Sequence, residues 1–373
     1  MRALFWLSTA LLAWTQAGYA LLLGLLSPRR APPAGVAAPA FDVSLIVAAY
    51  REEAVIAARV ANALALEWPR ERLQVIVAVD GGAEAGADAT AQRARDAGAD
   101  LVLELPRAGK MRAQDAAVAA ARGELLAFSD ANAMWEPDAL RALAAAFADP
   151  EVAYACGQVR FADGGGGNQE GLYWRYEMWM RARESELHSV TAGNGAIYAV
   201  RRSDYGAADP SMGHDLSLPF RMVKRGRRAV YVPAARASEK MVPTIEGEWR
   251  RKRRMMTQAW PIVLHGGLAD LRGYPPVYAL MVVSHRLLRY ASPLLHLLAL
   301  AASVALARRR LYAAALAAQA ALLAAAAAGG RVRARPLLVA RYYVLTTAAI
   351  GAGLLDHLRH GTPAGWEPAE GTR

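Results

Sequence analysis

The feature that most constrains this chain is a long apolar stretch near its start. The residues from Ala3 to Leu26, 24 in number, carry no charge and are dominated by leucine, alanine and aromatic side chains. As a helix, a stretch of this length spans the hydrocarbon core of a bilayer, which is about 30 Å thick. The alternative is a cleaved signal peptide, but the apolar core of such a peptide has only ~7 to 15 residues. The length therefore favours a transmembrane anchor over 1–27.

Two arginines, Arg29 and Arg30, follow this stretch at the start of a linker rich in proline and alanine, 28–40. Basic residues beside a membrane span tend to mark its cytoplasmic side. We therefore expect the segment that follows the linker to lie in the cytoplasm, on the inner face of the cell membrane.

The C-terminal part of the chain is also apolar. Three segments long enough to be membrane helices are separated by arginine-rich runs at 308–310 and 331–335, and they cover 290–307, 311–329 and 336–356. If the first runs outward from the cytoplasm, the arginines at 308–310 fall on the wrong side of the membrane. The conflict disappears if 336–356 or 278–290 lies along the membrane interface instead of crossing. The sequence leaves the number of C-terminal crossings open.

Between these ends, short apolar strands alternate with helices of about ten residues. The predicted strands are 44–49, 73–79, 100–105 and 124–129, and the predicted helices are 52–65, 87–97 and 110–121. This alternation predicts βαβ units, a mostly parallel sheet and the α/β fold class. In such sheets ligands bind where the carboxyl ends of the strands meet. The residues that follow the strands are therefore the candidate site.

Three groups of polar residues occupy these strand ends. Asp80 precedes two glycines, Lys110 follows Gly109 at a helix start, and Asp130 and Asn132 follow the fourth strand. Each has an ordinary structural interpretation, as a turn or a helix start. Each also suits a nucleotide ligand. A cation near the amides of a helix start can bind phosphate, and a carboxylate with a nearby amide oxygen can ligate a hard divalent cation.

Six segments, in this order along the chain, match patterns of one known family. They are Ala48-Ala49-Tyr50-Arg51-Glu52 for P-x-Y-N-E, Val79-Asp80-Gly81-Gly82 for V-D-G/D-S, Asp88 to Thr90 for D-x-T, Gly109 to Asp115 for G-K-x-x-A-x-N, Asp130-Ala131-Asn132 for D-x-D, and Gly213-His214-Asp215-Leu216 for an acidic pair that includes the base. Over about 44–256 the chain thus resembles the family 2 glycosyltransferases, which have the GT-A nucleotide-sugar-binding fold. The apolar flanks resemble the membrane-bound branch of that family. The segment Gly193-Asn194-Gly195 resembles a family loop near the donor sugar.

The resemblance implies a role for individual residues. Asp215 is implied as the catalytic base, Tyr50, Glu52, Asp80, Lys110, Asp130 and Arg254 as donor-binding residues, and Asp130 and Asn132 as ligands of a divalent metal, Mg²⁺ or Mn²⁺. The chemistry fits these roles. Negative charge develops on the leaving diphosphate, where a metal and basic groups stabilise it, while a carboxylate accepts the proton of the acceptor hydroxyl. Asp215 also has an ordinary interpretation, as an acid in the first turn of a helix.

Positive charge is concentrated in one part of the chain. The net charge is +11, and the segment 221–256 alone holds twelve Lys or Arg and three Glu, a local net of +9. Because this segment lies just before the C-terminal apolar region, anionic lipids of the cytoplasmic leaflet are its natural partner. The same position disfavours a nucleic-acid partner, which a basic chain otherwise suggests.

These observations predict an organisation and a function. The predicted parts are a transmembrane anchor (1–27), a linker (28–40), a cytoplasmic GT-A catalytic domain (41–260), an interfacial segment (261–289), a C-terminal transmembrane region (290–358) and a tail (359–373). The predicted function is that of an inverting, multi-pass membrane glycosyltransferase of cell-envelope glycans. It moves a sugar from a nucleotide-sugar donor, expected to be a uridine diphosphate sugar, to a lipid-linked or glycan hydroxyl.

Two alternatives stay open. One is a processive polysaccharide synthase, although the Q-x-x-R-W pattern of processive members is absent and Gln258-Ala259-Trp260 is out of register with it. The other is a non-catalytic membrane protein that retains a nucleotide-sugar-binding domain. Three departures from the family patterns support this second alternative, namely Arg51, Asn132 and His214.

Overall fold

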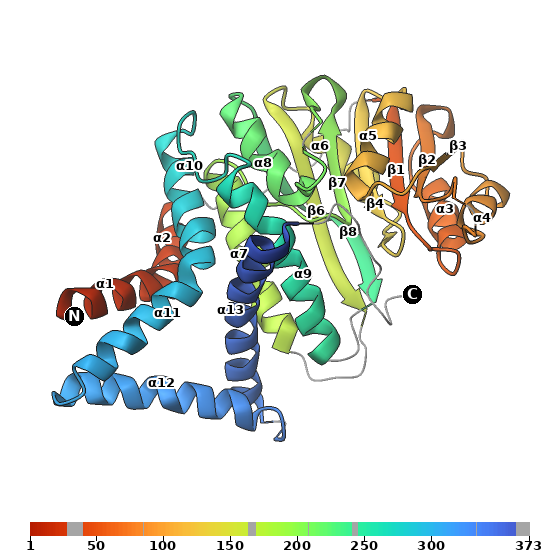
Figure 1. Ribbon diagram of the computed structural model, residues 1–373. Helices are drawn as coiled ribbons and strands as arrows, with labels where there is room; N and C mark the ends of the chain where they lie inside the picture. The colour runs from red at the N-terminus through yellow and green to blue at the C-terminus, as the bar shows by residue number, and fades with distance from the viewer. Residues whose placement is uncertain are drawn as a thin grey trace.

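The computed structural model describes residues 1–27, 40–84, 86–162, 169–207, 209–240, 245–332 and 334–362. The predicted linker 28–40 lies outside the described residues except for Ala40, and the predicted tail lies outside them from residue 363 onward. The described part forms an α/β domain with a group of apolar helices on one side of it (Figure 1).

The α/β domain is built on one sheet of eight strands in the order β3-β2-β1-β4-β7-β6-β8-β5. The strands are β1 (Val43–Ala49), β2 (Leu73–Asp80), β3 (Leu101–Leu105), β4 (Leu125–Asp130), β5 (Met134–Trp135), β6 (Val152–Ala162), β7 (Ile197–Arg201) and β8 (Arg228–Lys240). β1 to β4 are parallel, β6 is parallel to β8, and β7 and β5 are antiparallel to their neighbours. The mostly parallel sheet is confirmed, and the four predicted strands are correct to within one residue at each end.

The first strands are apolar throughout because helices cover both faces of the sheet. All seven residues of β1 are buried, and alternate residues face opposite sides. Leu45 and Val47 pack on one face of the sheet, and Ile46 packs on the other. The first face is covered by α3 (Ile56–Leu64), α4 (Thr90–Asp96) and α6 (Ala139–Ala146), and the second by α5 (Lys110–Ala120), α7 (Gln169–Leu187) and α8 (His214–Lys224).

Four helical segments of the described chain are long and apolar enough to cross a membrane. They are Arg2–Leu26, made of α1 (Arg2–Ala13), the π-helical η1 (Trp14–Gly18) and α2 (Tyr19–Leu26); Pro276–Ala305, made of α10 (Pro276–Met281), the π-helical η4 (Val282–Leu287) and α11 (Leu288–Ala305); α12 (Arg310–Ala328); and α13 (Arg335–His360). The predicted anchor and the three predicted C-terminal segments therefore coincide with helices. Residues 278–290, an alternative interfacial segment, belong to the same unbroken helix as the first predicted C-terminal span.

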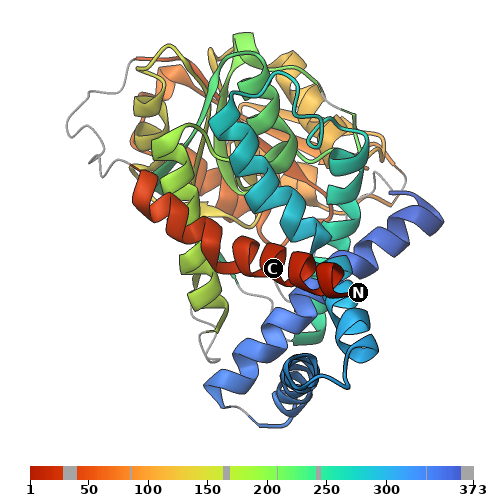
Figure 2. The ribbon, with the colours of Figure 1, turned by 90° about the vertical axis from the view of Figure 1, so that its left-hand side faces the viewer.

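These apolar helices do not run side by side as one bundle. In Figures 1 and 2, α12 runs across the lower end of α13, while the Arg2–Leu26 and Pro276–Ala305 helices lie against each other beside the α/β domain. The number of crossings and the domain boundaries at 261 and 290 stay predictions.

A further helix, α9 (Ile245–Leu264), carries a basic cluster, residues 250–254, and packs along α13. The indole Nε1 of Trp260 donates to the carbonyl oxygen of Ile350 at 3.0 Å, and Arg253 forms an ion pair with Asp356 at 2.5 Å. Gly353 permits the close approach, because a Cβ there would lie 2.7 Å from the Cβ of Met256. The basic cluster is thus attached directly to an apolar helix. Two short 3-10 helices, η2 (Arg70–Arg72) and η3 (Arg202–Asp204), complete the described elements.

Candidate functional site

Three parallel strands deliver polar residues to one edge of the sheet. Ala49 of β1 lies opposite Val79 of β2, and Ala48 lies opposite Asp130 of β4. Asp80 and Asp130 are the last residues of their strands, and Tyr50 directly follows β1. The three residues therefore lie at the same level of the sheet. This is the carboxyl edge, where ligands bind in sheets of this kind.

Asp80 fixes the loop that leads into α5. Its side chain is 2% exposed, accepts hydrogen bonds from the backbone N–H groups of Ala108 at 2.7 Å and Gly109 at 3.0 Å, and forms an ion pair with Arg107. Gly109 has φ +96°, a left-handed conformation that suits glycine. Because Lys110 is the next residue, Asp80 sets the position from which the lysine side chain begins.

Tyr50 joins the same group through Arg107. The guanidinium carbon of Arg107 lies 3.3 Å from the centre of the Tyr50 ring, a cation–π contact. Glu52 is 1% exposed, and its backbone N–H donates to the hydroxyl of Thr90 at 2.8 Å. This bond links the segments 48–52 and 88–90, both of which match family patterns. Arg107 was not predicted from the sequence. Its position just before Gly109 and Lys110 is the sequence feature that could have indicated a place at the site.

Lys110 lies among carboxylates at the centre of the site. Its ammonium group forms an ion pair with Asp130, and the side chains of the two residues are 19% and 25% exposed. Burial alone would lower the pKa of Lys110, but the charges of Asp130, Asp215 and Glu239 outweigh burial and raise it. The structure therefore brings together three predicted residues, Lys110, Asp130 and Asp215.

Glu239 is the acidic residue that sequence reasoning missed. It lies near the end of β8, opposite Phe161 of β6, and it is one of the charges that act on Lys110. In the sequence it is one of three acids in the basic segment 221–256. The pairing of β8 with β6 brings it near Lys110, and no local sequence pattern indicates that pairing.

Asp215 lies in the first turn of α8 and is half-buried. Burial raises the pKa of this carboxyl, the charge of Asp130 raises it further, and Lys110 opposes the rise. The backbone carbonyl oxygen of Asp215 accepts a hydrogen bond from Gly193 at 2.7 Å. A carboxylate with a raised pKa is suited to accepting a proton near neutral pH. Asp215 is also the acidic residue in the first turn of α8, as its ordinary structural interpretation predicts.

His214, which stands in place of an expected acid, is buried next to Asp215. Its Nδ1 lies 2.8 Å from the hydroxyl of Tyr198, and its Nε2 lies 3.3 Å from that of Tyr205. Burial, together with the charges of Lys110 and Arg221, lowers the pKa of His214 to about 3. The imidazole is therefore neutral at physiological pH and adds no charge to the site.

Asp130 and Asn132, the predicted metal ligands, lie at the end of β4 and in the turn that follows it. Asn132 lies in the turn that leads from β4 to β5, and the turn is closed by a hydrogen bond from the backbone N–H of Ala133 to the carbonyl oxygen of Asp130 at 3.2 Å. The ammonium of Lys110 already lies at this carboxylate. Among the described residues, no group of three or more His, Cys, Asp or Glu is placed to hold a metal. A metal here would therefore take most of its ligands from a diphosphate and water, as Mg²⁺ commonly does.

Arg254, the remaining predicted donor-binding residue, lies on α9 and is half-buried. Its role at the diphosphate stays a prediction, and so do the roles of the other predicted site residues.

One protein family and several solved structures match this chain. The family model described as "Glycosyltransferase like family 2" matches residues 39–257. A mannosyltransferase from Pyrobaculum calidifontis, solved in complex with GDP-Man and Mn²⁺, superposes with a TM-score of 0.73 at 22% identity, covering 95% of this chain and 99% of that one. This similarity shows that the fold is of the GT-A type.

Two curated relatives are each named N-acetylglucosaminyltransferase. The one from Rhizobium meliloti (strain 1021) is 28% identical over 268 residues, which cover 67% of this chain and 62% of the relative. The one from Bradyrhizobium diazoefficiens is 28% identical over 226 residues, which cover 55% of this chain and 46% of the relative. The matches thus span less than two thirds of the length of these relatives.

Proposed function

Because this chain belongs to glycosyltransferase family 2, we propose that it is a membrane-anchored inverting glycosyltransferase. It moves a sugar from a nucleotide-sugar donor to a hydroxyl of a lipid-linked or glycan acceptor. The observation that carries the proposal is the cluster at the carboxyl edge of the sheet, where Lys110 contacts Asp130 and is acted on by Asp215 and Glu239.

The donor is bound along the edge of the sheet. Tyr50, Glu52 and Asp80 hold the nucleoside end, with Arg107 supporting the ring of Tyr50. Lys110 neutralises the diphosphate, with Arg254 contributing from α9. Asp130 and Asn132 hold Mg²⁺ or Mn²⁺, which when bound stabilises the negative charge of the leaving diphosphate.

Asp215 accepts the proton of the acceptor hydroxyl. The acceptor oxygen forms a bond to the anomeric carbon, the bond from that carbon to the diphosphate oxygen breaks, and the nucleoside diphosphate leaves with the electron pair. Because the oxygen attacks the face opposite the leaving group, the configuration at the anomeric carbon is inverted. The raised pKa of Asp215 supports this role, since a stronger base takes the proton more readily.

The donor is proposed to be a uridine diphosphate sugar. The name of the curated relatives supports UDP-N-acetylglucosamine as the first donor to test, while the solved mannosyltransferase holds GDP-Man. The four apolar helices support a position in the cell membrane, and the arginines after the first of them support a cytoplasmic catalytic domain.

The test is release of nucleotide by the purified protein in detergent. A panel of nucleotide sugars is supplied with Mg²⁺ or Mn²⁺, with and without a membrane lipid extract. Release that depends on one donor, on the metal and on the extract is expected. If no donor gives release, the chain is better explained as a non-catalytic protein that retains the nucleotide-sugar-binding fold. Polymeric product from a single acceptor would instead indicate a processive synthase.

A further inference from the structure

The loop between α7 and β7, residues 188–196, connects the catalytic site to the apolar helices. Although it has no regular secondary structure, nearly all of it is buried. Surface position is the rule for loops, because buried backbone must find hydrogen-bond partners. The partners of this loop come from two directions.

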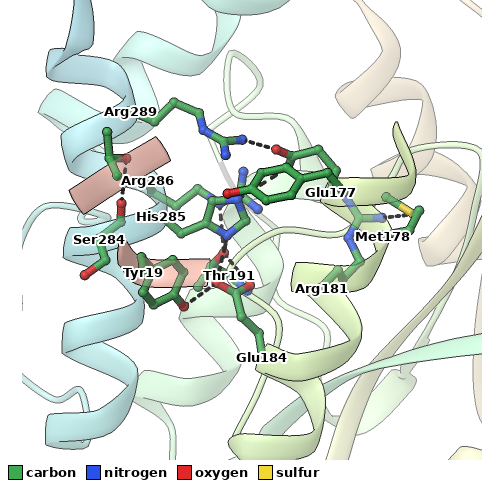
Figure 3. A network of polar contacts seen from close by, with 12 residues as sticks. Tyr19, Glu177, Met178, Arg181, Glu184, Thr191, Ser284, His285, Arg286 and Arg289 are labelled. Atoms are coloured by element: carbon green, nitrogen blue, oxygen red, sulfur yellow. Dashed lines mark hydrogen bonds and ion pairs between the residues drawn. The ribbon is translucent and has the colours of Figure 1, made fainter. Parts of the chain in front are cut away.

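On one side, the loop is held by the helix Pro276–Ala305. The hydroxyl of Tyr278 in α10 donates to the carbonyl oxygen of Val190 at 3.1 Å. The Nε of Arg286 in η4 donates to the hydroxyl oxygen of Thr191 at 2.8 Å, and that hydroxyl donates to Glu184 of α7 at 2.9 Å. Figure 3 shows Thr191 and Glu184 beside His285 and Arg286.

On the other side, the same loop touches the catalytic residues. The backbone N–H of Gly193 donates to the carbonyl oxygen of Asp215 at 2.7 Å. A Cβ on Gly195 would lie 3.5 Å from the ammonium of Lys110 and 3.8 Å from a carboxylate oxygen of Asp130. Only a few residues therefore separate the contacts to the membrane helix from the contacts to the proposed base and metal ligand.

The group that anchors the loop is a buried carboxylate. Glu184 is fully buried and accepts hydrogen bonds from the hydroxyl of Tyr19 in α2 at 2.8 Å and from Thr191, while Nδ1 of His285 lies 2.7 Å from it. Burial alone would raise the pKa of Glu184, but His285 and Arg286 outweigh burial and lower it, so the group is charged. Both apolar helices thus meet at one charged group beside the loop.

The two apolar helices contact each other at their π-helical segments. The indole Nε1 of Trp14 in η1 donates to the hydroxyl of Ser284 in η4 at 3.0 Å, and the hydroxyl of Thr15 donates to the carbonyl oxygen of Ser284 at 3.0 Å. π-helical turns within α-helices are frequent at functional sites. Here one of them carries Arg286, which holds the loop.

We propose that Tyr278 and Arg286 are positioning residues for sugar transfer, acting through Val190 and Thr191 on the loop that holds Asp215. The inference rests on the proposed function. If the inference is correct, turnover depends on the placement of the apolar helix Pro276–Ala305, which lies outside the segment matched by the family model.

Matched variants of the full-length protein test the proposal. Thr191→Val removes the hydroxyl that joins the loop to Glu184 and Arg286. Its control, Thr15→Val, removes a buried hydroxyl that bonds to Ser284 where the two apolar helices meet. Likewise, Tyr278→Phe loses the bond to Val190, and Tyr274→Phe loses bonds to the carbonyl oxygens of Gly267 and Leu268. Thr191→Ser keeps the hydroxyl and serves as the conservative rescue.

We expect Thr191→Val and Tyr278→Phe to lower kcat by about tenfold or more, because a small displacement of reacting groups is costly. The KM for the donor is expected to change by less than about twofold, and Thr191→Ser, Thr15→Val and Tyr274→Phe are expected to keep kcat within about twofold of the unmodified protein. Equal losses of kcat in Thr15→Val and Thr191→Val would overturn the proposal, since they would indicate a general loss of packing.

Hydrogen exchange of the backbone amides provides a readout that does not require a known donor. Thr191→Val is expected to speed exchange in residues 189–195 and 213–217, and Thr15→Val is not. Unchanged protection of both segments in Thr191→Val would overturn the positioning role even if no donor is found. Absence of turnover in the unmodified protein, with the expected change in exchange, would count against the proposed function alone.

Discussion

The proposed catalytic edge of the sheet and the junction where Glu184 meets the apolar helices both use charged and polar pairs, but in opposite ways. At the sheet edge, Lys110 and Asp130 pair while 19% and 25% exposed, so a donor and a metal can reach both groups. At the junction, Glu184 and His285 are 0% and 1% exposed and contact each other at 2.7 Å. The pair proposed to exchange partners during turnover is partly accessible, whereas the pair that joins α7 to the apolar helix is sealed from water.

The difference has an energetic side. The more completely a pair of interacting polar groups is sealed from water, the more the loss of one member costs, because its partner is left uncompensated; for a fully buried ion pair the cost is about 3 to 5 kcal/mol. Substitutions at the sheet edge should therefore mainly lower activity, and substitutions at the junction should mainly lower stability.

The largest expected effect is on turnover at the sheet edge. Asp215→Asn should lower kcat by about 10²- to 10⁴-fold, the range expected for loss of a general base, while binding of the donor is retained. The measurement is nucleotide release in parallel with donor binding by calorimetry. Asp209→Asn, at an exposed carboxylate before α8, is the control and should keep kcat within about twofold. Unchanged turnover in Asp215→Asn would remove that residue from the mechanism.

The next effect contrasts the stability of the two regions. Glu184→Gln should destabilise the protein by about 3 to 5 kcal/mol, because His285 and Arg286 lose a charged partner in a buried place. Lys110→Met should destabilise the protein less than Glu184→Gln does, because the groups around Lys110 stay partly accessible to water, while it abolishes most turnover. Thermal unfolding in detergent measures both. Similar melting temperatures for the two variants would contradict the distinction between a sealed junction and an exchangeable site.

A third prediction concerns pH. The pKa of Asp215 is raised in the folded protein, so kcat/KM should fall as the pH drops through a value above the usual range of an aspartate. Because Lys110 opposes that rise, Lys110→Met should move this acid limb to higher pH. His214, whose pKa is about 3, should add no inflection between about pH 5 and 8, where an ordinary histidine titrates. The pH–rate profiles of the two proteins provide the test, and an acid limb that moves to lower pH in Lys110→Met would contradict the assignment.

The same raised pKa predicts an effect on stability. The folded protein binds the proton of Asp215 more tightly than the unfolded chain does, so the contribution of this group to stability falls as the pH rises through that range. Asp215→Asn should therefore be at least as stable as the unmodified protein at neutral pH. A fall in melting temperature would show that the carboxylate has a structural role at the start of α8.

Much of the α/β domain could be predicted from sequence because its first strands are buried on both faces. Val43–Ala49 and Leu73–Asp80 are entirely buried and therefore appear as nearly continuous apolar runs. The ends of the predicted strands then located Asp80 and Asp130. The pattern of strands and helices located only the site residues next to those elements, whereas Asp215 was indicated by the resemblance of 213–216 to a family pattern.

The remaining contacts depend on elements that are distant in the chain. Glu239 reaches the site because β8 pairs with β6 through two register shifts, which no local pattern indicates. Glu184 and His285 are 101 residues apart in sequence. The charges of 278–290 led to the alternative of an interfacial segment, which stays a prediction, and the structure adds that His285 and Arg289 have partners on α7. Sequence alone shows such charges but not the partners that bury them.

The smallest expected effect tests the residue that departs from the metal-binding pattern. Asn132→Asp places a second carboxylate two residues after Asp130 and adds negative charge next to the proposed cation site, so the apparent Kd for Mn²⁺ should fall by about tenfold or less. Turnover at saturating metal should change little, since the base and Lys110 are untouched. The measurement is nucleotide release titrated with Mn²⁺, with Asp209→Asn as the control. If the Kd is unchanged or rises, Asn132 is not a metal ligand, and the cation is held by Asp130 and the donor without it.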